Sequence, residues 1–167
     1  MKVTISHEYQ TDPKTFWDRV FFDEAYNKAL YVEGLGFPEY ALLEQSDKGD
    51  SIHRRVRVTP RQEAPAAVQK LLGGRFSYVE EGTFDRATQR YRFRVVPATL
   101  ADKIRAEGEL RAEPAGEGRM RRVLEMTVEV KVFGIGGIAE GFVSKSMQDS
   151  YAQAAAFTNK WLAQQRG

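Results

Sequence analysis

Seven segments of the chain alternate between apolar and polar residues with the two-residue period of a β-strand. In the first segment, residues 3–9, alternation places Val3, Ile5, His7 and Tyr9 on one face. The other six form three successive pairs joined by short polar turns: 40–46 with 51–59, 75–84 with 89–96, and 101–112 with 119–132. Because strands joined by tight turns pair with each other, this order predicts an antiparallel meander.

Two short helices are predicted between the first strand and the first hairpin. Thr11 or Asp12 can cap the first helix, with Pro13 at a position where its missing N–H costs nothing. Asp23 can cap the second helix, and Gly34 can end it in the left-handed conformation that glycine tolerates.

The longest predicted helix ends the chain and follows a glycine-rich corner at residues 134–137. Its apolar stripe consists of Ile138, Phe142, Tyr151, Ala154, Ala155, Thr158, Trp161 and Leu162. At a rise of 1.5 Å per residue this helix is about 40 Å long, enough to cross a sheet. A further helix of about two turns is predicted before the glycines at 73–74. Strands followed by one long helix predict an α+β fold rather than a doubly wound one.

The composition is that of a single folded domain over residues 1–167. Hydrophobic residues make up 42% and charged residues 29% of the chain, which excludes a disordered or fibrous class. The chain has no cysteine, and no segment has the apolar length of a signal peptide or a membrane span, so we expect a cytoplasmic protein. The formal net charge of +2 is small for a nucleic-acid binder, and no nucleic-acid partner is expected.

Motifs for catalysis or cofactor binding are sparse. His7 and His53 are the two histidines, and no Ser/His/Asp order, HExxH motif or calcium-loop spacing is present. Residues 134–139 match G-x-G-x-x-A, but a dinucleotide site needs a second parallel strand after the helix, and no such strand follows. The sequence therefore predicts no cofactor and no metal.

Three charged residues fall on otherwise apolar strand faces. Alternation places Arg54, Glu80 and Arg122 on the same faces as the apolar residues of their strands. A buried charge is costly unless it is paired, so pairing is expected whether or not a ligand binds. Two interpretations stay open: a structural ion pair, or a polar anchor for the headgroup or carboxylate of a ligand.

The opposite faces of the strands carry many charges. The basic residues are Arg90, Arg92, Arg94, Arg119 and Arg121, and the acidic residues on neighbouring strands are Glu107, Glu109, Glu125 and Glu129. Cross-strand pairing on a solvated face is the first interpretation. Transient contact with an anionic membrane is the alternative. Aromatic residues alternate to the other face, so they cannot stack on bases beside these arginines.

Together these features resemble the START-like (SRPBCC, helix-grip) superfamily. The resemblance covers nearly the whole chain and rests on the early segment FWDRVFFDEAYNKAL, the middle segments RRVRVTP and APAAVQKLLGGRFSYVEEGTFD, and the final segment VFGIGGIAEGFVSKSMQDSYAQAAAFTNKWL. It is closest to an uncharacterised bacterial family of stand-alone START-like domains, distantly similar to sterol-binding VASt domains. It implies a helix-grip fold, in which a curved antiparallel sheet wraps around the C-terminal helix, with two short helices after the first strand.

The same resemblance implies an internal cavity between the sheet and the last helix. The residues expected to bind a ligand there are Tyr40, Leu42, Arg54, Tyr78, Tyr91, Phe93, Met126, Phe142, Met147 and Tyr151. Tyrosine hydroxyls would add a few hydrogen-bonding points to an apolar wall, which is typical of small-molecule sites.

The predicted function is binding or transport of a hydrophobic small molecule (a lipid, sterol-like or polyketide-like compound) without covalent chemistry. The first alternative is a cyclase- or dehydratase-like enzyme acting on a polycyclic or polyketide substrate, with His7 or Glu80 as general base. The second is a protein-interaction module of cochaperone type that uses the outer face of the sheet.

Overall fold

The computed structural model describes residues 1–61, 64–74 and 76–166, and within them seven strands form one antiparallel sheet. The order across the sheet is β1-β7-β6-β5-β4-β3-β2, so the three hairpins form a meander and β1 pairs with β7. The bounds are β1 (Lys2–Tyr9), β2 (Glu39–Asp47), β3 (Ser51–Thr59), β4 (Tyr78–Asp85), β5 (Arg90–Pro97), β6 (Ile104–Pro114) and β7 (Met120–Val130). The predicted meander is confirmed.

Each of the two short helices after β1 is an α-helical turn that continues as a π-helical segment. The segments are α1 (Pro13–Thr15), η1 (Phe16–Phe21), α2 (Glu24–Lys28) and η2 (Ala29–Gly34). Both predicted caps are present: Asp12 accepts a hydrogen bond from the Thr15 N–H at 2.8 Å, and Asp23 accepts one from the Tyr26 N–H at 2.9 Å. Local sequence therefore determines where both helices begin.

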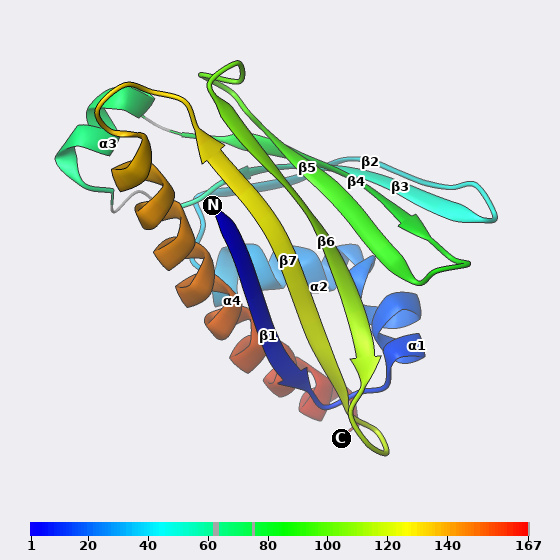
Figure 1. Cartoon of the computed structure of the whole chain (residues 1–167). Coiled ribbons are helices and arrows are strands. Elements are labelled where there is room, and N and C mark those ends of the chain that lie inside the picture. Colours follow the sequence, from blue (N-terminus) through cyan, green and yellow to red (C-terminus); the bar gives the residue numbers. More distant parts are fainter. Residues whose placement is uncertain (62–63, 75, 167) are drawn as a thin grey trace.

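The other two helices are α3 (Ala66–Leu72) and α4 (Gly136–Arg166). Figure 1 shows α4 running along one side of the curved sheet, with α3 near its first turns and α2 behind the strands. Helix α4 packs against β1, β7 and η2. This arrangement confirms the predicted α+β, helix-grip architecture. Among the described residues, no helix is both long and apolar enough to span a bilayer.

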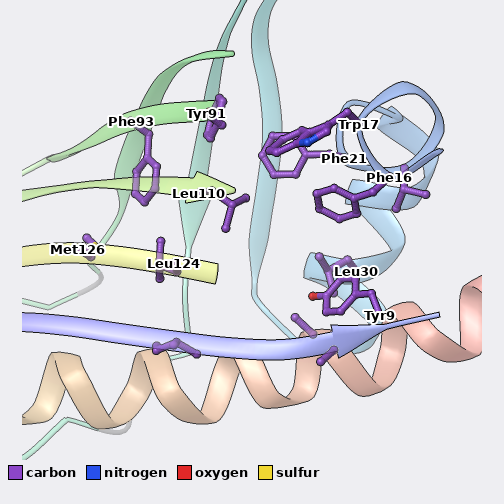
Figure 2. Close-up of a cluster of buried hydrophobic side chains, with 14 of the residues drawn as sticks. Tyr9, Phe16, Trp17, Phe21, Leu30, Tyr91, Phe93, Leu110, Leu124 and Met126 are labelled. Atoms are coloured by element: carbon purple, nitrogen blue, oxygen red, sulfur yellow. The ribbon is translucent and has the colours of Figure 1, made fainter. Parts of the chain in front are cut away.

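An aromatic cluster fills the space next to α1 and η1 (Figure 2). Phe16 and Trp17 lie edge to face at 5.0 Å between ring centroids, and Trp17 lies 4.5 Å from Phe84 of β4. On the α4 side, the Tyr26 hydroxyl hydrogen-bonds with that of Thr158 at 2.6 Å, and Thr158 is fully buried. This part of the interior is a solid core.

Two local predictions from the sequence are wrong. Ile138 is 53% exposed, whereas its neighbour Ala139 is 4% exposed, so the first turns of α4 are rotated by about one residue from the predicted stripe. Gly34 does not adopt the left-handed conformation. A Cβ at Gly34 would lie 2.9 Å from the ring of Phe157, so the glycine allows η2 to approach α4 closely.

Candidate functional site

Two adjoining cavities lie between α4 and the sheet. The η2 chamber, of about 210 Å³, lies beside Leu30, Tyr31 and Leu35 and is lined on the other side by α4. The α3 chamber, of about 180 Å³, lies beside Val68 and Leu72. The walls shared by both chambers are Phe76, Tyr78, Glu80, Val143, Met147 and Tyr151. Together the chambers come within the range of about 300–1,000 Å³ that small-molecule sites occupy.

Six of the ten residues expected at the ligand site line these chambers. Tyr78, Met147 and Tyr151 line both, and the residues that line only the α3 chamber are Phe93, Met126 and Phe142. Tyr78 and Tyr151 keep accessible surface although they lie in the interior, because that surface faces the cavities.

Tyr40, Leu42, Arg54 and Tyr91 line neither chamber. Tyr40 stacks on Tyr31 with ring centroids 4.7 Å apart, which holds its ring against η2. Leu42 lies on the edge strand β2, directly before an irregularity in the pairing with β3. Arg54 and Tyr91 are turned toward Glu80, as described below.

Sequence reasoning missed the walls that the helices contribute. Tyr31 of η2 and Val68 of α3 line the η2 and α3 chambers respectively. An amphipathic pattern with a 3.6-residue period does not anticipate Tyr31, because the i→i+5 hydrogen bonding of η2 changes which positions share a face. The apolar periodicity of residues 66–72 was a usable signal for α3, but it does not reveal which part of the sheet the helix covers.

Arg54, Glu80 and Tyr91 form a buried polar cluster beside the chambers. Arg54 is 3% exposed, and its Nη2 donates to Glu80 Oε2 at 3.1 Å. The Tyr91 hydroxyl donates to the same oxygen at 3.1 Å. Burial opposes the charge of Arg54, but the nearby Tyr91 and Glu80 outweigh burial and raise the pKa of the guanidinium above its ordinary value. For Arg54 the contacts are therefore those of a structural ion pair.

Arg122 has different surroundings. Its Nη1 donates to the Tyr9 hydroxyl at 2.9 Å, and its guanidinium carbon lies 5.0 Å from the centroid of the Tyr151 ring. Its Nε is buried and has no hydrogen-bond partner in the described part of the chain. Arg122 lines the η2 chamber, whereas Arg54 does not.

The tyrosines of the chambers are neutral at physiological pH. Burial raises the pKa of Tyr151 to about 12 and also raises the pKa of Tyr78. Neither hydroxyl hydrogen-bonds to another residue within the described ranges. Both hydroxyls can therefore donate to a bound molecule.

Gly82 allows Tyr91 to reach Glu80. A Cβ at Gly82 would lie 2.1 Å from the Tyr91 hydroxyl oxygen, and the backbone of Gly82 has an ordinary φ, so the constraint is steric. We expect Gly82→Ala to displace Tyr91 and to lower the free energy of unfolding by about 1–3 kcal/mol, measured by urea denaturation. Gly137→Ala is the control, since its new methyl would meet no atom within 4 Å. Equal stability of the two variants would contradict this account.

His7, which is paired with Arg122 across β1 and β7, makes the stability of the protein depend on pH. Burial, and then the charge of Arg122, lower the pKa of His7 below 6.5. In this range the unfolded chain binds more protons than the folded chain, so stability increases with pH. We expect the free energy of unfolding to fall as the pH drops below about 6.5. His7→Gln should remove this contribution to the pH dependence of the free energy of unfolding, and His53→Gln should retain it. The same pH dependence in both variants and in the unmodified protein would contradict the role of His7.

A larger hollow than either chamber, of about 990 Å³, lies on the outer face of the sheet and is lined mainly by charged and polar side chains. Two of its arginines pair with carboxylates across strands: Arg92 with Glu109 at 3.0 Å, and Arg94 with Glu81 at 2.8 Å. This confirms the expected cross-strand pairing. Exposed pairs of this kind each contribute only about 0–1 kcal/mol, and no ligand assignment follows from them.

The comparisons with known proteins agree with the fold. A START superfamily protein from Mycobacterium smegmatis is 15% identical, with a TM-score of 0.64 over 96% of this chain and 98% of that chain. The Zhui aromatase/cyclase from Streptomyces sp. R1128 is 16% identical, with a TM-score of 0.62 over 92% and 91% of the two chains. Norcoclaurine synthase from Thalictrum flavum is 14% identical, with a TM-score of 0.65 over 98% and 86% of the two chains.

At these identities the likeness concerns the fold alone. A search of curated proteins found no match. The structures named above are START-like proteins, and none of them is a VASt domain. The family model described as "Protein of unknown function (DUF2505)" matches residues 4–162. The structure and the solved structures named above show that the chain has the START-like fold. Since the family match spans nearly the whole chain, the protein belongs to that family.

Proposed function

We propose that this protein binds a hydrophobic small molecule in the η2 and α3 chambers, without covalent chemistry. The observation that carries the proposal is the pair of adjoining cavities beneath α4, with largely apolar walls and a few convergent polar groups. Removal of apolar surface from water would drive binding at about 25 cal/mol per Å². Tyr78 and Tyr151 would orient the ligand through their free hydroxyls.

The structural neighbours support this proposal in general terms. One structure of norcoclaurine synthase from Thalictrum flavum is a complex with dopamine and hydroxybenzaldehyde, and its TM-score to this chain is 0.65. The fold can therefore accommodate small aromatic molecules. Two finer points stay predictions: that the ligand is sterol-like, and that the chain is distantly similar to VASt domains.

The contacts of the two candidate general bases favour binding over catalysis. Glu80 faces both chambers, but Oε2 already accepts hydrogen bonds from Arg54 and Tyr91, as expected of a carboxylate with a structural role. His7 lines neither chamber. Two structural neighbours are enzymes by name, an aromatase/cyclase and norcoclaurine synthase. Because of the contacts of Glu80 and His7, we still rank a catalytic function of this protein below a binding function.

A fluorescence titration with the neutral probe N-phenyl-1-naphthylamine tests the proposal. Val143 lines both chambers, and we expect Val143→Trp to fill them and to weaken probe binding at least tenfold, or about 1.4 kcal/mol. Ile138→Trp is the matched control, because it introduces the same side chain on an exposed position of the same helix. Circular dichroism would confirm that both variants fold.

Two outcomes would overturn the proposal. The first is the absence of saturable probe binding by the unmodified protein. The second is equal probe affinity of the folded Val143→Trp variant and the unmodified protein, which would place the probe outside the chambers.

A further inference from the structure

We propose that the ligand carries a carboxylate and that Arg122 binds this group in the η2 chamber, with the apolar tail extending into the α3 chamber. This inference rests on the proposed function and specifies the class of ligand: an aliphatic or aromatic monocarboxylic acid. Three observations support it, namely the charge balance of the chamber, the free donors of Arg122 and the gradient of polarity between the chambers. His7 provides a readout of the charge at Arg122.

The charge balance leaves one cation without a partner. Among the described residues, Glu80 and Arg122 are the charged ones that line the η2 chamber, and Glu80 already pairs with Arg54. Within the described residues no carboxylate lies at ion-pair distance from Arg122. Its contacts are instead the hydroxyl of Tyr9 and the ring of Tyr151. A buried guanidinium favours a counterion, and a ligand carboxylate would supply one.

The hydrogen-bond donors of Arg122 match a carboxylate. Nη1 is engaged with Tyr9, whereas Nη2 donates to no other residue in the described part of the chain and is not enclosed. Nε also has no partner there and is enclosed by protein. The planar guanidinium presents parallel N–H groups that bind both oxygens of a carboxylate. Arg54 Nε is also unpartnered, but Arg54 lines neither chamber and its charge is already paired.

Polarity decreases from the η2 chamber to the α3 chamber. The η2 chamber contains Arg122 and the side chains of Ser146 and Ser150. Of the residues that the structure describes, the α3 chamber adds only apolar side chains to the shared walls, among them Leu72 and Val128. A molecule with one anionic end and one apolar end fits this gradient.

His7 is positioned to report the charge at Arg122. The two residues are paired across β1 and β7, and the cation contributes to lowering the pKa of His7. A carboxylate bound to Arg122 would offset that cation and raise the pKa of His7. A neutral ligand would leave this electrostatic contribution in place.

The experiment compares dodecanoate with dodecan-1-ol as competitors of N-phenyl-1-naphthylamine, below the micelle concentration of dodecanoate. We expect dodecanoate to bind at least tenfold more tightly than the alcohol. Arg122→Met should remove this preference while the probe still binds. Arg121→Met is the matched control, because it makes the same change at the adjacent exposed position and should retain the preference.

NMR titration of the His7 ring gives a second readout on the unmodified protein. Dodecanoate should raise the pKa of His7, and dodecan-1-ol should not raise it. Equal affinities for the two competitors, or dodecanoate binding that leaves the pKa of His7 unchanged, would overturn the role of Arg122 while the proposed function stands. Failure of the unmodified protein to bind the probe would overturn both.

Discussion

Glu80→Leu is expected to lower the free energy of unfolding by about 3–5 kcal/mol, because it leaves the charge of Arg54 buried without a counterion. Arg54 is 3% exposed, so its charge has little direct access to solvent. The Tyr91 hydroxyl would lose its acceptor in the same variant. Adding Arg54→Met should recover most of the loss, since a buried ion pair and an apolar pair of similar volume differ little in stability.

Urea denaturation of the two single variants and the double variant measures this coupling as a double-mutant cycle. Glu81→Leu is the matched control on the next residue of β4. Glu81 faces the outer side of the sheet, where it pairs with Arg94, and its loss should cost no more than about 1 kcal/mol. If Glu80→Leu costs no more than Glu81→Leu, the buried pair has no structural role.

Phe16→Ala is expected to lower the free energy of unfolding by about 3–5 kcal/mol as well. Phe16 is 1% exposed, and its ring centroid lies within 6 Å of those of Tyr9, Trp17 and Phe21. These neighbours belong to β1 and η1, so they cannot close the space that the missing ring leaves without moving a strand or a helix.

The control for this prediction is Phe133→Ala. Phe133 lies fully exposed in the corner before α4, and its truncation should change stability by no more than about 0.5 kcal/mol. Thermal or urea unfolding of both variants gives the comparison. A loss below about 1 kcal/mol for Phe16→Ala would mean that the aromatic cluster is loosely packed, and that the interior could rearrange around a larger ligand.

Much of the fold was predictable because its determinants are local. Asp12 and Asp23 cap the helices that follow them, and polar turns close the three hairpins. Alternation along a strand is also a local property. The sequence therefore predicted that Arg54 and Glu80 lie on the inner face of the sheet, and the structure brings them together.

The partners of these inner residues depended on the tertiary structure. Arg54 lies opposite Gly82 in the pairing of β3 with β4, and it meets Glu80 diagonally. Tyr91 meets the same carboxylate only because Gly82 has no side chain in its path. Glu80 is therefore paired with Arg54 and Tyr91. Arg122 has no carboxylate partner in the described part of the molecule.

The sequence by itself thus determined the elements of this protein, their order and the face on which each strand residue lies, since these properties arise from contacts between near neighbours along the chain. The tertiary structure decided which inner residues line the chambers. That outcome depends on the rotation of α4, the position of α3 and the π-helical geometry of η2, which are set by packing between segments far apart in sequence.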